Sequence, residues 1–127
     1  MPDSYRPFVP GARPGGRPSE RPRYRVLVHH KFSELWKEIP SRVGLESAQQ
    51  FYDHVSATPG EPPQVNSSVV LKGKAGRPKF DGGSRTIHYE ISGAGRIDYQ
   101  HVNEFTGGKL SDAHPVVFIL TIDLSSH

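Results

Sequence analysis

The second half of the chain alternates apolar and polar residues with a period of two. In residues 85–92 and 96–102 the apolar phase holds Ile87, Tyr89, Ile91, Ile97 and Tyr99. The polar phase holds His88, Glu90, Arg96, Asp98 and Gln100. Because successive side chains of a strand point to opposite faces, this pattern predicts two strands with one covered face and one open, titratable face. The apolar run 115–123 predicts a third strand.

The first half of the chain predicts a strand followed by a helical hairpin. Residues 24–29 are rich in valine and read as a strand. Phe32, Leu35, Trp36 and Ile39 follow at the spacing i, i+3, i+4, i+7, which predicts a helix that ends at Pro40. We expect a second helix from about residue 43 to the Pro-Gly pair at 59–60, and residues 68–71 are either a short strand or the approach to the next one. Phe32 and Trp36 are expected to be core residues.

Composition favours a single domain preceded by a tail. The chain has 127 residues, of which 34% are apolar, and this is enough to bury one core. Residues 1–22 are rich in proline, arginine and glycine and predict a disordered tail, which leaves residues 23–127 for the domain. The absence of cysteine excludes disulfides, zinc–thiolate sites and cysteine nucleophiles, and fits the reducing cytoplasm. The longest apolar run is much shorter than the roughly 20 residues that span a bilayer, so no membrane partner is expected.

The positive charge of the chain lies mainly in its tail. The net charge is +3, and residues 1–25 contain six arginines against two carboxylates, so the remaining residues carry one net negative charge. Recognition of a polyanion by the domain therefore needs a local patch. The densest candidate is the stretch 72–79, followed by a further cation at the start of the next strand; these RNA-binding candidates are Lys72, Lys74, Arg77, Lys79 and Arg85. The alternative is a solvated loop, and the stretch lacks the ending of a P-loop.

The histidines outside the polar phase predict no metal site. If His29 and His30 both belong to the strand, their side chains point to opposite faces and cannot bind one ion. His101 shares the phase of Tyr99 and is expected to pack at the end of the sheet. Since no ligand spacing typical of a metal site appears, we expect neither a metal nor a cofactor.

In its order of elements the chain resembles the RelE/ParE superfamily of toxins from toxin–antitoxin systems. The resemblance is carried by residues 24–28, the helical hairpin, Leu71-Lys72-Gly73, residues 95–100 and residues 116–120. It implies an α+β fold with an N-terminal strand, a helical hairpin and antiparallel strands, which together form a four-stranded sheet with the helices on one face. Residues 103–114 are an insertion where relatives have a short turn.

The resemblance also implies a function, namely a ribosome-dependent mRNA endoribonuclease. Arg96 takes the position of the arginine that contacts the scissile phosphate, and His127 takes the position of a C-terminal acid or base. The chemistry of metal-free RNA cleavage adds His88 or Glu90 as the base. The implied partners are an antitoxin protein and the ribosome with its mRNA, in a homodimer or a toxin–antitoxin hetero-oligomer.

Simpler interpretations stay open for each of these residues. Glu90 and Arg96 also fit a cross-strand ion pair, His88 an exposed histidine and His127 a frayed terminus. Thr86 and His88 stand where the RelE branch carries lysines, which favours a non-catalytic member that binds a protein partner. A third alternative is a nucleic-acid-binding accessory protein that acts through its arginine-rich tail.

Overall fold

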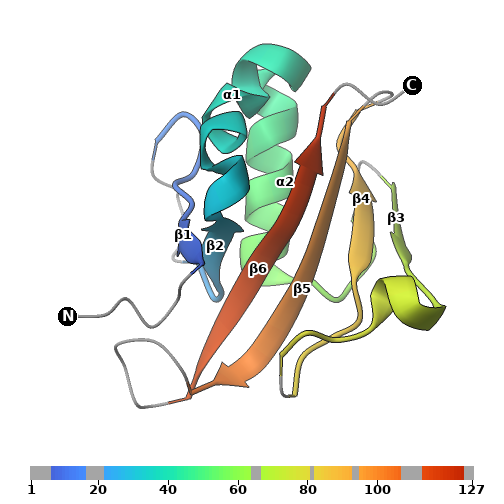
Figure 1. Ribbon diagram of the computed structural model, residues 1–127. Coiled ribbons are helices and arrows are strands. Elements are labelled where there is room, and N and C mark those ends of the chain that lie inside the picture. The colour runs from blue at the N-terminus through green and yellow to red at the C-terminus, as the bar shows by residue number, and fades with distance from the viewer. Residues whose placement is uncertain are drawn as a thin grey trace.

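The chain folds into one sheet with two helices on one of its faces (Figure 1). The structure is a computed structural model, and it describes residues 7–16, 22–63, 67–80, 82–92, 95–106 and 113–124. The elements are, in order, β1 (Phe8–Pro10), β2 (Arg25–His29), η1 (His30–Phe32), α1 (Ser33–Val43), α2 (Leu45–Ala57), β3 (Ser67–Val70), η2 (Gly73–Gly76), β4 (Ile87–Glu90), β5 (Arg96–Phe105) and β6 (His114–Asp123).

The sheet corrects the predicted fold. Among the described residues it has six strands, in the order β1-β2-β6-β5-β4-β3, and it is mixed because β2 and β6 are parallel whereas the other neighbours are antiparallel. The prediction of a four-stranded, mainly antiparallel sheet with a helical hairpin is therefore wrong, although the α+β class is confirmed. The strand at one edge, β1, has only three residues, too few for a periodic pattern to reveal it, whereas β3 at the other edge coincides with the short strand considered for residues 68–71.

The phase prediction for the covered face is confirmed. Ile87, Tyr89, Ile97 and Tyr99 are at most 5% exposed, and they pack with the helices in one apolar core. Phe51 of α2 contacts both tyrosines edge-on, at ring-centroid distances of 4.8 and 6.2 Å. The helices thus cover the face that the sequence pattern assigns to them (Figure 1).

Helix α1 does not end at Pro40, as the sequence predicts. It continues through the proline to Val43 and stops at Gly44, whose φ of 99° lies in the left-handed region that favours glycine. The proline removes one donor from the helical ladder, but the amide of Gly44 still donates to the carbonyl of Pro40. The end of the helix is therefore set by the glycine.

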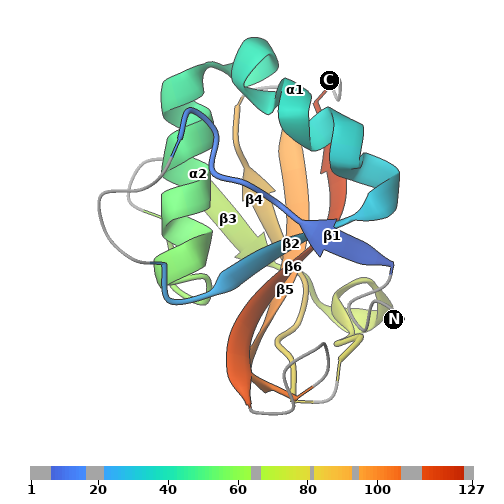
Figure 2. The same cartoon turned by 90° about the vertical axis from the view of Figure 1, so that its left-hand side faces the viewer.

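The N-terminal segment 7–16 packs against the domain, whereas the sequence predicts a disordered tail for residues 1–22. Phe8 is 5% exposed, and β1 pairs with β2. Beyond β1 the chain crosses the helices (Figure 2), where Trp36 Nε1 donates to the carbonyl of Ala12 at 3.0 Å. Arg13 donates two hydrogen bonds to the carboxylate of Asp53, at 2.8 and 3.0 Å. Residues 1–6 and 17–21 lie outside the described residues.

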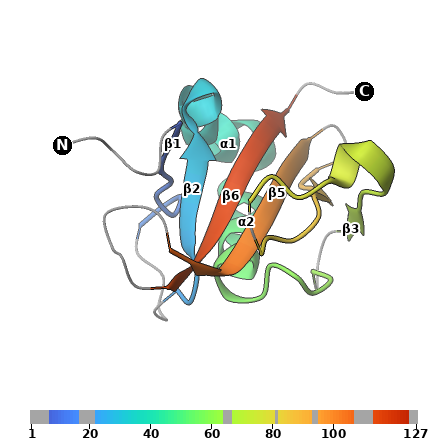
Figure 3. The same ribbon diagram turned by 60° about the horizontal axis from the view of Figure 1, so that its bottom comes forward.

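The second face of the sheet is only half open, which corrects the expectation of a fully open polar face. A smaller apolar cluster forms there from Phe8, Leu27, Val102, Val116 and Phe118. The chain that follows η2 runs across β5 (Figure 3), and the ring of Phe80 stacks on Phe118 with centroids 3.9 Å apart. Among the described helices, none is long and apolar enough to cross a membrane.

Candidate functional site

The open half of the second face carries two cross-strand rows of polar side chains. They come from the ends of β4, β5 and β6 that meet at one edge of the sheet. In register, the first row is His88, Asp98 and Thr121, and the second is Glu90, Arg96 and Asp123. Directly opposed side chains on one face are close neighbours, so each row forms a contiguous polar strip.

A β-bulge in β6 brings its polar residues to this face. Asp98 pairs with Thr121 while Tyr99 pairs with Ile119, so β6 has one extra residue between these pairs. Ile119 and Ile122 consequently both point to the helices, at 0% and 3% exposure, although they are three positions apart. The bulge thus directs Thr121 and Asp123 to the second face, as bulges next to functional sites often do.

All residues of these rows except Glu90 line a hollow of about 480 Å³, which we call the β4–β6 hollow. Its lining consists of Phe32, His88, Arg96, Asp98, Thr121, Ile122 and Asp123. It therefore combines an imidazole, a guanidinium, two carboxylates and a hydroxyl with one aromatic ring. The sequence places the first two among its catalytic candidates, and the structure brings them together.

His88 and Asp98 form an oriented pair in the hollow. Nδ1 of His88 lies 2.5 Å from Oδ1 of Asp98, and the two side chains are 33% and 25% exposed. An ionised carboxylate only accepts, so Nδ1 carries the proton that it donates to Asp98. This tautomer leaves the lone pair of Nε2 available, which is how a carboxylate prepares an imidazole to act as a base.

Arg96 has structural contacts as well as a place in the hollow. Its Nη1 donates to the carbonyls of Ser92 and Gly95 at 3.0 and 2.9 Å, which ties it to the turn between β4 and β5. Its Nη2 lies 3.9 Å from Oε2 of Glu90, so the cross-strand ion pair predicted from the sequence is confirmed. Glu90 does not line the hollow, and of the two candidate bases only His88 does.

Four of the five candidate RNA-binding residues lie on the loop that contains η2. Lys72, Lys74, Arg77 and Lys79, which together we call the cationic segment, are exposed. Arg85 instead donates to the carbonyls of Leu71 and Gly73, at 2.9 and 2.7 Å, and so closes the loop that contains η2. Arg85 thus holds the cationic segment in place.

Gln100 joins the cationic segment to the sheet. Its side chain is fully buried; Oε1 accepts from the amide of Lys79 at 2.9 Å, and Nε2 donates to Arg77 O and Thr86 Oγ1 at 3.0 and 2.8 Å. Because Gln100 follows Asp98 by two positions on β5, the backbone of Arg77 and Lys79 lies further along this strand than the β4–β6 hollow, whose described lining includes no residue of the cationic segment. The polar phase of the sequence contains Gln100 but does not reveal its burial.

The remaining histidines lie elsewhere. His30 belongs to η1 and not to the strand, and its ring stacks on that of His29 at 4.9 Å. His101 lies within β5, opposite Val117 of β6, and not at the end of the sheet as predicted; its ring is 6.0 Å from that of Tyr24, and burial lowers its pKa. His127 lies outside the described residues. In the described part of the chain, no three histidine or carboxylate side chains are grouped as metal ligands.

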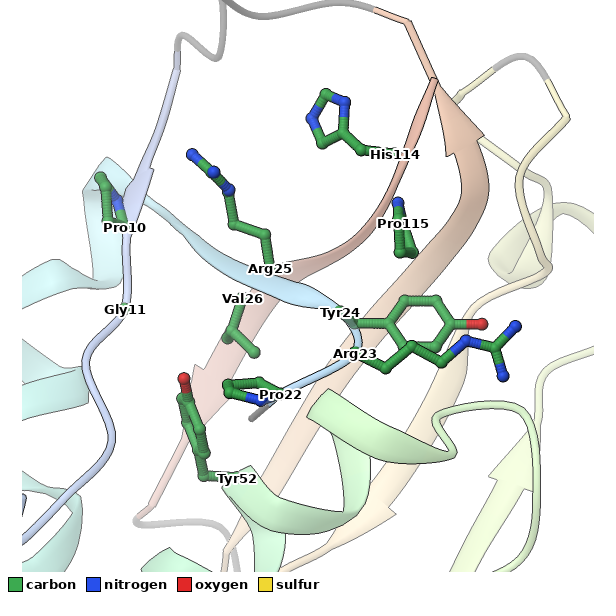
Figure 4. Close-up of a pocket in the computed structure, with 10 residues that line it drawn as sticks. All are labelled: Pro10, Gly11, Pro22, Arg23, Tyr24, Arg25, Val26, Tyr52, His114 and Pro115. Atoms are coloured by element: carbon green, nitrogen blue, oxygen red, sulfur yellow. The ribbon is translucent and has the colours of Figure 1, made fainter. Parts of the chain in front are cut away.

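A second hollow, of about 460 Å³, lies where β2 and β6 begin. Figure 4 shows Arg25 and His114 projecting to the same side of these neighbouring strands, with Tyr52 of α2 below them. Its described lining residues include Arg23 but no carboxylate. It lacks an oriented acid–base pair such as His88 and Asp98, so the β4–β6 hollow is the better candidate for chemistry.

The chemistry of the β4–β6 hollow is thus an oriented base and a cation in one lining, with further cations on the loop that Gln100 joins to β5. Proton abstraction next to an anionic group is the reaction that this arrangement favours. Comparison with protein-family models, with curated proteins and with solved structures finds no match to the chain.

Proposed function

We propose that the chain is a RelE-like toxin of a toxin–antitoxin system that cleaves ribosome-bound mRNA without a metal. The observation that carries the proposal is the His88–Asp98 pair in a hollow that also contains Arg96. The element order supports it, since β2, the two helices and the three antiparallel strands β4, β5 and β6 follow one another in the order on which the resemblance rests. An antitoxin protein and the ribosome are the proposed partners.

In the proposed reaction the 2′-hydroxyl of the RNA attacks the adjoining phosphorus. Nε2 of His88 takes the hydroxyl proton, and Asp98 stabilises the imidazolium that forms. Arg96 stabilises the negative charge that builds up on the phosphate oxygens. The 5′-oxygen leaves with a proton from an acid, the role predicted for His127, and the products are a 2′,3′-cyclic phosphate and a 5′-hydroxyl.

The charges around the hollow bear on how RNA approaches. Asp98 is paired with His88, and Asp123 lies opposite Arg96 in the register, so the hollow itself has little positive charge to offer. The exposed cations of the cationic segment supply the attraction instead. Binding should therefore weaken steeply as the salt concentration rises.

Cleavage of ribosome-bound mRNA by wild type and three variants tests the proposal. His88→Gln should lower the rate by about 10²–10⁴-fold, since it removes the base. Arg96→Ala should lower it by about 10²–10³-fold. Glu90→Gln is the matched control, because it removes a neighbouring carboxylate that does not line the hollow, and it should stay within a few-fold of wild type.

Thermal melts must show that the variants fold, because Arg96 also holds the β4–β5 turn. Unchanged cleavage by folded His88→Gln would remove the proposed base. Replacing His127 with glutamine in the same assay tests the predicted acid.

A second candidate is a non-catalytic member that binds a protein partner. It is favoured by the environment of Arg96, whose guanidinium already donates to two carbonyls and lies between carboxylates on both neighbouring strands. Growth arrest on induction without mRNA cleavage, retained by His88→Gln, would support this function over the first.

A further inference from the structure

Phe32 occupies a position that its sequence pattern does not predict. The helical stripe assigns it to the core, yet it is only half-buried and lines the β4–β6 hollow. It packs against the core beneath the helices and also faces a hollow whose other lining residues, apart from Ile122, are polar. It is therefore the single aromatic surface offered by the described lining of this hollow.

The ring of Phe32 is held in place by its neighbours. It contacts the ring of His29 edge-on at 6.4 Å, and His29 in turn contacts Phe8 at 5.3 Å and stacks on His30. The η1 turn is closed by the hydroxyl of Ser33, which donates to the carbonyl of His30 at 3.0 Å. A ring fixed in this way loses little freedom when a ligand stacks on it.

The hollow has different chemistry at its two sides. The cationic segment lies over β5 beyond Asp98, where Gln100 holds the backbone of Arg77 and Lys79, whereas Phe32 follows β2 on the far side of β6. Arg96 and the His88–Asp98 pair lie between them, on β4 and β5. A ligand that runs from the cationic segment to Phe32 would thus pass the acid–base pair and Arg96 on its way.

We propose that Phe32 is a base-stacking residue: a nucleobase of single-stranded RNA lies on its ring while the adjoining phosphate lies at Arg96. The inference rests on the proposed function and specifies its substrate, because a base within a duplex is already stacked and cannot reach the ring. Every base has a flat face, so stacking here selects for single strands and not for a sequence.

Binding of a short, non-cleavable 2′-O-methyl oligoribonucleotide tests this inference, with affinity measured by fluorescence anisotropy. Phe32→Leu keeps an apolar side chain against the core but removes the ring, and it should weaken binding by about 5- to 150-fold. Phe32→Tyr is the matched control and should bind like wild type. In a series of oligoribonucleotides that each lack the base at one position, wild type should bind one of them more weakly than the others. Phe32→Leu should bind all of them equally.

The outcomes separate the stacking role from the proposed function. Equal affinity of wild type and folded Phe32→Leu, while wild type cleaves mRNA, would refute the stacking role alone. Weaker binding by Phe32→Leu with the same abasic position still discriminated would also refute it, since the base would then lie elsewhere. Absence of RNA binding and of cleavage by wild type would refute the proposed function and the stacking role together.

Discussion

Replacing Gln100 with leucine should detach the cationic segment from the sheet without unfolding the domain. Leucine has a similar volume and suits a fully buried site, so no large cavity is expected. The substitution removes an acceptor for the amide of Lys79 and donors to Arg77 and Thr86. The perturbation thus acts on hydrogen bonds that join a surface loop to the core.

The size of the effect follows from these contacts. Three hydrogen bonds at about 0.5–1.5 kcal/mol each set an upper range of roughly 1.5–4.5 kcal/mol. Lys79 and Arg77 are exposed, so water can satisfy their backbone groups once the loop moves, and we expect a loss of about 2–3 kcal/mol in the free energy of unfolding. For a chain of this size that corresponds to a decrease in Tm of roughly 6–15 °C.

Urea unfolding and hydrogen exchange together test this expectation. The amide of Lys79 should lose its protection in Gln100→Leu, while the amides of β5 and β6 remain protected. Thr86→Val is the matched control, because it removes only one of the three bonds and should cost about 1 kcal/mol. A loss below about 0.5 kcal/mol in Gln100→Leu, with Lys79 still protected, would refute the reasoning.

Two further predictions concern stability. Gly76→Ala should lower the free energy of unfolding by about 1–3 kcal/mol, because an added Cβ would lie 1.9 Å from the carbonyl oxygen of Leu71. Urea titration measures this loss, and Lys74→Ala is the control, which should leave the free energy of unfolding unchanged. Burial lowers the pKa of His54 and of His101 below about 6.5, so the unfolded chain binds more protons than the folded one as the pH falls. The free energy of unfolding should therefore be constant above about pH 7 and decrease below about pH 6.5. If its decrease with falling pH were just as steep in His54→Gln and in His101→Gln, this assignment would be contradicted.

The parts of the fold that the sequence predicts are those with a local period. The stripe that contains Trp36 and the alternation that contains Tyr89 and Tyr99 identify their buried faces, because each pattern involves neighbours along the chain. Strand β1 could not be found in this way. Its burial depends on contacts of Phe8 with β2 and with the loop that carries Phe80, and both are remote in sequence. The proline-rich residues on either side of β1 instead indicate a tail.

The part of the candidate site that the sequence predicts is likewise the part with a local period. The polar phase places His88, Asp98 and Arg96 on one face, and the structure confirms that they share it. The phase says nothing of what covers that face, so the burial of Gln100 beneath the loop had no signal in the sequence. Phe32 fits the helical stripe, but it is the first residue of the stripe and lies just beyond the end of β2, between the core and the hollow.

The hollow depends on the bulge in β6 and on the loop that Gln100 holds over β5. With strict alternation along β6 from Ile119, Asp123 would point to the helices and Ile122 to the second face, which would bury a carboxylate among apolar side chains. The bulge removes this conflict, because it turns Ile122 into the core and leaves Asp123 opposite Arg96. The loop held by Gln100 then covers only the half of the face where β6 presents Val116 and Phe118. Apolar burial therefore determines where the loop lies, and the polar remainder of the same face is left as the place where a ligand can bind.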